Sequence, residues 1–180
     1  MSSTVAGRLT FKEFERLPDP PDGGRYELLE GELVLAPPAK LDHSDIRDAL
    51  FDWLNARLSA DWKRRIEFAC VLGDRSYLIA DLGVTSRLRW LAARGESYFS
   101  GAPELAVEII SPSNSAAEID EKTSLFFRYG AQEFWTVNQR RKSVTVHSVD
   151  QPRRVYAGSD RVLLTRFGID EPLPLSAIFS

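Results

Sequence analysis

Cysteine is almost absent from this sequence, with Cys70 alone among 180 residues. A lone cysteine cannot form an intrachain disulfide, and the opening stretch MSSTVAGRLTFKEF lacks the basic and then apolar pattern of a secretory signal. Long apolar runs are absent too, since none approaches the ~20 residues that a transmembrane helix needs. We therefore expect a cytoplasmic protein with no role in a membrane.

An excess of positive charge is also missing, because the formal net charge is -3. Non-specific nucleic-acid binding rests on Lys and Arg side chains that neutralise phosphates, so the overall charge gives no support for such binding. Basic residues do cluster locally, and we interpret these clusters as solvated turns or helix faces. They lie at 63–65, 87–94, 140–142 and 153–154.

Apolar residues are plentiful, at 43% of the chain, which is enough to build the core of one ordinary domain. The sequence shows no internal repeat, low-complexity tract or linker that would divide it. We therefore predict one domain over residues 1–180.

Hydrophobic periodicity and turn residues predict a mixed order of helices and strands. Helices are expected at 11–16 after the cap Thr10, from Asp42 or Ser44 to about Ala60, at 87–95 and at 115–129. Strands are expected as a hairpin at 26–29 and 32–36, then at 65–72, 77–86, 104–110, 132–138 and 142–149, with a final antiparallel pair at 153–158 and 161–165 before a closing segment at 173–179. This order favours a mixed α/β domain.

Glu108 interrupts the most apolar of these strands, ELAVEII. A strand period of two places it on one face with Ala106 and Ile110. An unpaired carboxylate in such surroundings costs several kcal/mol, so we expect Glu108 to protonate, pair with a cation or bind a metal. A buried ion pair or an edge strand with one wet face also explains the residue without any function.

Two further polar residues break apolar patterns in the same way. Asp81 interrupts SYLIADLGV, although a turn is the simpler interpretation there because Asp is a poor strand residue. Lys122 lies on the apolar stripe of its predicted helix, where it either extends past its neighbours to water or reaches a carboxylate cluster at the end of the preceding strand. Because Glu108 lies just before the loop into this helix, the second alternative needs no unusual topology.

Glutamates crowd the first predicted hairpin, at Glu27, Glu30 and Glu32. Most hairpin glutamates are solvated, but a spare carboxylate beside Asp81 and Glu108 would suit a hard divalent cation, which prefers oxygen ligands. Such an ion lowers the pKa of a bound water and stabilises charge on a phosphate, while a lysine can orient the nucleophile.

Several stretches together resemble the Uma-type restriction endonuclease family of bacteria, which lies within the PD-(D/E)XK nuclease superfamily. They are RYELLEGELV, IADLGV, LAVEIISPSN, DEKTSLFFRYGAQEFWTVN and the proline-plus-His43 start of the long helix, and the resemblance spans about 9–179. The most specific part is VEIISPSN followed by EK, an aromatic-rich helix end and EFW. The resemblance implies a restriction-endonuclease-like fold, in which helices flank a mixed central sheet that has an N-terminal hairpin.

By that resemblance, Asp81 and Glu108 take the places of the superfamily's acidic pair on adjacent strands, and Lys122 supplies the lysine from the following helix. Glu27 matches the family's first-hairpin glutamate, which implies a further metal ligand or a water-orienting group. The implied metal ligands are thus Asp81, Glu108 and Glu27, holding Mg²⁺ or Mn²⁺.

The sequence departs from these patterns at three positions. Ala80 stands where a proline usually precedes the Asp, Ile110 stands where the superfamily has its lysine, and Glu118 replaces an Asp four residues before Lys122. Because Ile110 stands in the lysine's place, the nuclease interpretation depends on Lys122. His43 either contacts the site or helps to start the long helix, and we favour the structural role.

The favoured function is a Mg²⁺- or Mn²⁺-dependent endonuclease acting on DNA phosphodiesters, with Asp81, Glu108, Lys122 and Glu27 as catalytic residues and Lys122 orienting the attacking water. The alternative is a non-catalytic module that keeps the nuclease fold to bind DNA or a protein partner. A serine nucleophile at Ser111 or Ser113 and a two-carboxylate glycosidase rank last. A homodimer would pair two sites for cutting both strands, but no residue pattern is direct evidence for it.

Overall fold

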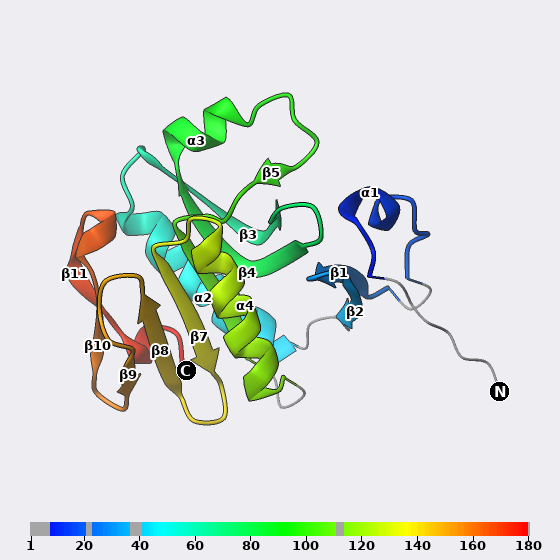
Figure 1. Cartoon of the computed structure of the whole chain (residues 1–180). Helices are drawn as coiled ribbons and strands as arrows, with labels where there is room; N and C mark the ends of the chain where they lie inside the picture. The colour runs from blue at the N-terminus through cyan, green and yellow to red at the C-terminus, as the bar shows by residue number, and fades with distance from the viewer. Residues whose placement is uncertain (1–7, 21–22, 37–40, 111–113, 180) are drawn as a thin grey trace.

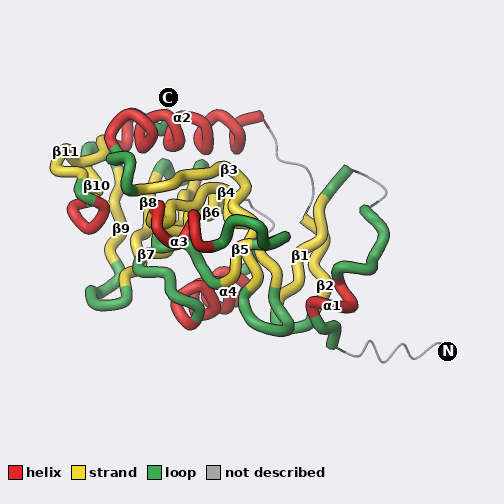
Figure 2. Tube along the Cα trace, turned by 90° about the horizontal axis from the view of Figure 1, so that it is seen from above, coloured by secondary structure: helices red, strands yellow, loops and turns green. Residues whose placement is uncertain are grey.

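The computed structural model describes residues 8–20, 23–36, 41–110 and 114–179. Its centre is a mixed β-sheet with a long helix on each face (Figure 1). Helix α2, Leu41–Arg57, covers one face and helix α4, Ala116–Arg128, covers the other, as the view from above shows (Figure 2). The predicted mixed sheet flanked by helices is therefore confirmed.

Nine strands of the described ranges form the main sheet. Along its main path the order is β2-β1-β4-β6-β7-β8-β9, and β3 pairs with β4 and β5 off this path. The pairs β6–β7 and β3–β5 are parallel, and the others are antiparallel. The strands are β1 Arg25–Leu29, β2 Glu32–Ala36, β3 Trp62–Val71, β4 Tyr77–Ser86, β5 Phe99–Ser100, β6 Leu105–Ile110, β7 Glu133–Asn138, β8 Ser143–Ser148 and β9 Arg154–Ala157.

The two long helices bury the apolar stripes that their sequence spacing predicts. On α2, Ile46 and Leu50 belong to a core shared with residues of β6, β7 and the C-terminal segments. On α4, Leu125 and Phe126 belong to a second core, which includes Phe134 of β7. Within the described ranges, no helix combines the length and the apolar character needed to cross a bilayer.

Hydroxyl side chains cap three of the helices, and one of these caps, Thr10, is predicted from the sequence. Two short helices, α1 Phe11–Phe14 and α3 Arg87–Ala92, complete the set. The side chains that cap α1, α3 and α4 belong to Thr10, Ser86 and Ser115. Helix α2 instead begins at Leu41, before both of the predicted caps.

The predicted pairing of the last strands is wrong. Strand β9 pairs with β8, whereas β10, Arg161–Leu164, pairs with β11, Ile169–Pro174, in a separate two-stranded sheet. Strand β11 escaped prediction because its sequence, IDEPLP, contains prolines and acidic residues that are poor strand formers. Short 3-10 helices at Thr165–Phe167 and Leu175–Ala177 flank β11.

Gly83 of β4 lets the buried ring of Phe68 pack directly on the backbone. A Cβ atom at Gly83 would lie 2.5 Å from Cγ of Phe68. Because a packed core resists an added carbon, we expect Gly83→Ala to lower the free energy of unfolding by about 1–3 kcal/mol. Urea denaturation measures this change. The double variant Gly83→Ala/Phe68→Leu, in which the ring is replaced by a smaller side chain, should lose less stability than the two single variants lose in sum. Strictly additive losses would contradict this packing argument.

Candidate active site

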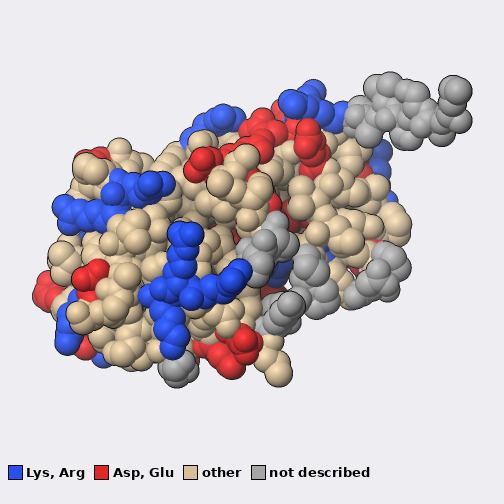
Figure 3. Space-filling view, turned by 90° about the horizontal axis from the view of Figure 1, so that it is seen from below, with Lys and Arg blue, Asp and Glu red and all other residues tan. Residues whose placement is uncertain are grey.

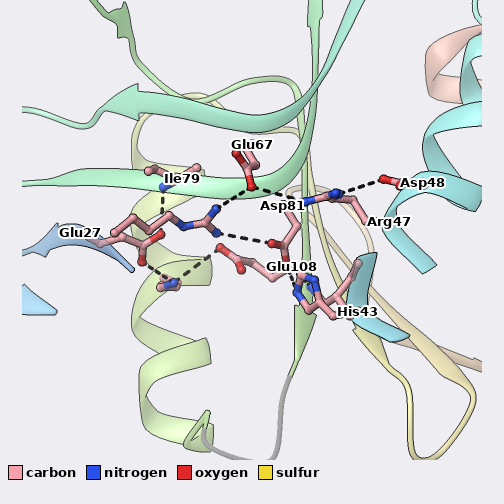
Figure 4. Close-up of polar contacts among 11 residues, drawn as sticks. Glu27, His43, Arg47, Asp48, Glu67, Ile79, Asp81 and Glu108 are labelled. Carbon is pink, nitrogen blue, oxygen red and sulfur yellow. Dashed lines mark hydrogen bonds and ion pairs between the residues drawn. The ribbon is translucent and has the colours of Figure 1, made fainter. Parts of the chain in front are cut away.

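Four polar side chains that the sequence singles out converge between the sheet and α4. Glu27 lies on β1, Asp81 on β4, Glu108 on β6 and Lys122 on α4. The three strands are consecutive neighbours in the sheet, and the four residues are between 2% and 8% exposed. Figure 4 shows the three carboxylate side chains beside one another across these strands. The expected convergence is thus what the structure shows.

Lys122 forms the link between two of these carboxylates. Its Nζ atom lies 2.8 Å from Oε2 of Glu27 and 3.6 Å from Oε1 of Glu108. Burial by itself disfavours the ammonium, but the charges of Glu108 and Glu27 outweigh it and raise the pKa of Lys122. Lys122 is therefore a fixed positive charge and a hydrogen-bond donor, rather than a base.

Glu27 uses both of its carboxylate oxygens for contacts within the protein. Oε2 accepts a hydrogen bond from Nζ of Lys122, and Oε1 accepts one at 3.1 Å from the backbone N–H of Ile79 on β4. The short contact with the ammonium favours a role for Glu27 in holding Lys122. The metal-ligand role that the resemblance implies stays a prediction.

Asp81 is held at three points. Its Oδ2 atom accepts a hydrogen bond at 2.7 Å from the backbone N–H of Ile109, on the adjacent strand β6, and lies 3.1 Å from Nε2 of His43. Its Oδ1 atom lies 3.6 Å from Nη2 of Arg25. Because β4 and β6 are paired, these contacts fix the Asp81 carboxylate next to the strand that carries Glu108.

An irregularity in the strand ladder accompanies Asp81. The register of β3 against β4 places Glu67 across from Asp81, but the two do not form a ladder pair. Glu67 has a φ of 51°, in the left-handed region that interrupts a regular strand. Its carboxylate lies 3.3 Å from Nη1 of Arg25, so Arg25 spans the distance between Glu67 and Asp81.

Glu108 is the least satisfied member of the group. Within the described ranges, its Oε1 atom is buried and has no hydrogen-bond partner, although Lys122 lies at ion-pair distance. Burial raises the pKa of Glu108 to about 8, with Lys122 opposing this change and the charges of Asp81 and Glu27 adding to it. Glu108 thus lacks a nearby cation strong enough to offset its burial.

Two other buried glutamates show what a structural carboxylate looks like in this protein. Glu104 accepts a hydrogen bond at 2.9 Å from Nη1 of Arg89, and Glu133 accepts one at 2.8 Å from Nε1 of Trp135. Each is satisfied by protein donors, as buried polar groups normally are. Glu108 differs from both because its buried Oε1 atom has no hydrogen-bond donor within the described ranges. We expect this of a carboxylate whose partner is not a protein side chain.

The donor set at Asp81 and Glu108 fits a divalent cation. Among the described residues, no group of three or more His, Cys, Asp and Glu side chains is arranged to hold a metal. Two carboxylates still suffice for Mg²⁺, which usually keeps several waters and binds substrate phosphates as well. A cation beside Glu108 would also supply the positive charge that this carboxylate lacks.

The pattern of the Uma2 family, described as "Putative restriction endonuclease", matches residues 11–170. The chain belongs to the Uma2 family. A solved structure, "a putative nuclease belonging to DUF820" from Anabaena variabilis ATCC 29413, is similar with a TM-score of 0.83 and 23% identity over 95% of this chain and 97% of that chain. No curated protein matches the chain. The predicted family and restriction-endonuclease-like fold are confirmed.

The Uma2 match includes every site residue that the sequence predicts. Ile110 stands on β6 two residues after Glu108, where the superfamily has its lysine. Lys122 instead approaches Glu108 from α4. Glu118, on the same helix, accepts a hydrogen bond at 3.1 Å from Nδ2 of Asn114, so its contacts lie at the start of α4.

Two further side chains contact Asp81 in this Uma2 chain, those of Arg25 and His43. A site contact was the less favoured alternative for His43, and Arg25 was not considered. A histidine and an arginine carry no periodic signal that could reveal this contact. The one available sign for Arg25 was its position two residues before Glu27 on the same strand, which places both on one face.

The raised pKa of Glu108 predicts how the stability of this Uma2 protein depends on pH in a chelating buffer. The folded protein keeps a proton that the unfolded chain releases, so the stabilising contribution is complete below about pH 4.5 and is lost as pH rises through about 8. We expect the free energy of unfolding to fall by a few kcal/mol across this range. Urea titrations at several pH values measure it. The Glu108→Gln variant should lack this component, and parallel profiles for the two proteins would contradict the assignment.

Proposed function

We propose that this Uma2 protein is a Mg²⁺- or Mn²⁺-dependent nuclease that hydrolyses DNA phosphodiester bonds. The observation that carries the proposal is the environment of Glu108, a buried carboxylate without a hydrogen-bond donor in the described ranges that adjoins both Asp81 and a fixed lysine. The family description and the printed title of the similar structure, which both name nucleases, support the same function.

In this proposal Asp81 and Glu108 hold the cation, and Glu27 has a positioning role. When bound, the cation would polarise the scissile phosphate and lower the pKa of the attacking water. The chain's own residues prepare the site for this chemistry. His43, Arg25 and the backbone of β6 fix the Asp81 carboxylate in one orientation.

Lys122 has two tasks at the reacting phosphate. Its ammonium donates to the attacking water and orients it, and its charge stabilises the extra negative charge that develops on the phosphate oxygens. Glu27 holds Nζ at 2.8 Å, so Lys122 needs little rearrangement at the moment of reaction. Because its pKa is raised, Lys122 keeps its proton and cannot act as the general base.

The direct test is a cleavage assay on plasmid and oligonucleotide DNA with Mg²⁺, with Mn²⁺ and with EDTA. We expect cleavage by the wild-type protein only with a divalent cation, and loss of that cleavage in Glu108→Ala and Lys122→Ala variants whose folding is verified by circular dichroism. Equal activity in wild type and both variants would point to a contaminating nuclease and contradict the proposal.

A non-catalytic module for binding DNA or a protein is the second candidate. The observation that favours it is the absence, among the residues that the structure describes, of a cluster of three or more metal-ligating side chains. This candidate predicts that the wild-type protein binds its partner and does not cleave DNA with Mg²⁺, with Mn²⁺ or with EDTA. Metal-dependent cleavage that disappears in Glu108→Ala would eliminate it. The homodimer stays a prediction.

A further inference from the structure

A large groove lies next to the candidate active site and has one strongly basic wall. The groove has a volume of about 1350 Å³ and runs between the β7–β8 turn, the starts of α2 and α4 and the C-terminal segment. Its basic wall consists of Arg140, Arg141 and Lys142 in the turn, together with Arg153 before β9. From below, basic side chains gather near the middle of this face (Figure 3).

The four basic side chains are not committed to partners within the protein. All four residues are exposed, and none forms an ion pair or a side-chain hydrogen bond within the described ranges. Elsewhere, arginines such as Arg57, Arg128 and Arg166 do pair with carboxylates. Uncompensated charges on one wall create a positive potential that attracts an anionic partner.

The turn presents these charges on a fixed backbone. Oδ1 of Asn138 accepts a hydrogen bond at 3.0 Å from the backbone N–H of Arg141, and the backbone N–H of Lys142 donates to the carbonyl of Gln139 at 3.2 Å. These bonds involve no side-chain atom of Arg140 or Arg141. Both side chains can therefore be removed without removing the contacts that shape the turn.

Neighbours of the site residues line the groove, although Glu27, Asp81, Glu108 and Lys122 do not. Ile110, which lines it, follows Glu108 by two residues on β6, so both side chains lie on one face of that strand. Asp42 and Asp45, which also line it, flank His43 in the first turns of α2. An extended ligand lying along the basic wall would thus pass the edge of the catalytic cluster.

Acidic residues also line the groove, which limits the type of ligand and its position. Asp42, Asp45 and Asp120 line it from α2 and α4. A polyanion would be repelled by these carboxylates and attracted to the β7–β8 turn, so the charges of the lining restrict its position in the groove. Thr136, Asn138 and Thr145 add neutral polar groups along the groove, which suit phosphate and sugar oxygens.

We infer that this groove binds the sugar-phosphate backbone of a nucleic-acid strand, with Arg140, Arg141, Lys142 and Arg153 contacting successive phosphates. The inference rests on the proposed nuclease function and specifies where its substrate lies. It also replaces the interpretation of the clusters at 140–142 and 153–154 as separate solvated turns, because the fold places them on one wall.

The test is the salt dependence of DNA binding in EDTA, where cleavage is prevented. Fluorescence anisotropy with duplex and single-stranded oligonucleotides compares wild type with Arg140→Ala/Arg141→Ala. We expect the variant to bind about tenfold more weakly and to lose about two from the magnitude of the slope of log affinity against log salt, because two phosphate contacts are removed. The control Arg87→Ala/Arg94→Ala, which removes two exposed charges at α3, should leave both quantities unchanged.

The outcomes separate this inference from the nuclease function. An Arg140→Ala/Arg141→Ala variant with unchanged affinity and slope, or a wild-type protein that binds neither oligonucleotide, would overturn the inference. If that variant loses binding while no form of the protein cleaves DNA, the groove stands and the nuclease proposal fails. If binding and cleavage are both unaffected by the substitutions, the nuclease proposal stands and the groove fails.

Discussion

Replacing Glu108 by Gln or Asp81 by Asn is expected to lower the rate of metal-dependent DNA cleavage by roughly 10³-fold or more. Each substitution keeps the size of the side chain and removes the negative charge that holds the cation. In the metal-free protein, Glu108→Gln replaces a buried carboxyl group whose pKa is raised to about 8 and which is therefore mostly protonated at neutral pH, so the substitution should not destabilise the fold there. Activity and stability should therefore change in different directions.

Glu133→Gln provides the matched control for this prediction. Glu133 is also a buried glutamate, on strand β7, but Trp135 and Arg166 satisfy its carboxylate. We expect the variant to retain cleavage within a few-fold of wild type, provided that it remains folded. Rates are measured at saturating Mn²⁺ with folding checked by thermal denaturation. Comparable losses of activity in Glu133→Gln and Glu108→Gln would show that any buried carboxylate matters, and the assigned site would then be wrong.

Replacing Lys122 by Met is expected to give the largest change in stability, a loss of about 3–5 kcal/mol in the free energy of unfolding. Lys122 is buried and contacts both Glu27 and Glu108. Methionine fills a similar volume but leaves these carboxylates without their common cation. Urea denaturation at neutral pH measures the loss.

Two further variants show whether the charge or the packing of Lys122 is responsible. Adding Glu27→Gln to Lys122→Met should recover part of the lost stability, because one of the uncompensated carboxylates is then gone. Arg128→Met removes the exposed pair between Arg128 and Glu30 and should cost less than about 1 kcal/mol. A Lys122→Met variant no less stable than Arg128→Met would contradict a buried charge cluster.

The sequence predicts the main secondary structure of this protein well where apolar patterns are long. The stripes of α2 and α4 and the apolar runs in β4 and β6 identify their elements, and the polar residues that interrupt these patterns identify most of the candidate site. Asp81, Glu108 and Lys122 stand out because burying a charge is costly unless something compensates it. Such an anomaly is visible without a structure.

Contacts between distant segments could not be predicted in the same way. His43 and Arg25 reach Asp81 from α2 and β1, and neither interrupts an apolar pattern. Glu27 was predicted as a metal ligand, but only the fold shows that Ile79 and Lys122 occupy its two oxygens. A side chain's role depends on its partners, and those are set by tertiary structure.

The central claim is that Asp81 and Glu108 form a divalent-cation site. The most direct test is a Mn²⁺ titration monitored by electron paramagnetic resonance. This method distinguishes free from bound Mn²⁺ without any substrate. We expect the wild-type protein to bind Mn²⁺, Glu133→Gln to bind it equally, and Glu108→Gln and Asp81→Asn to bind it at least about 10-fold more weakly. Mn²⁺ binding of the same strength in wild type, Glu108→Gln and Asp81→Asn would contradict the site.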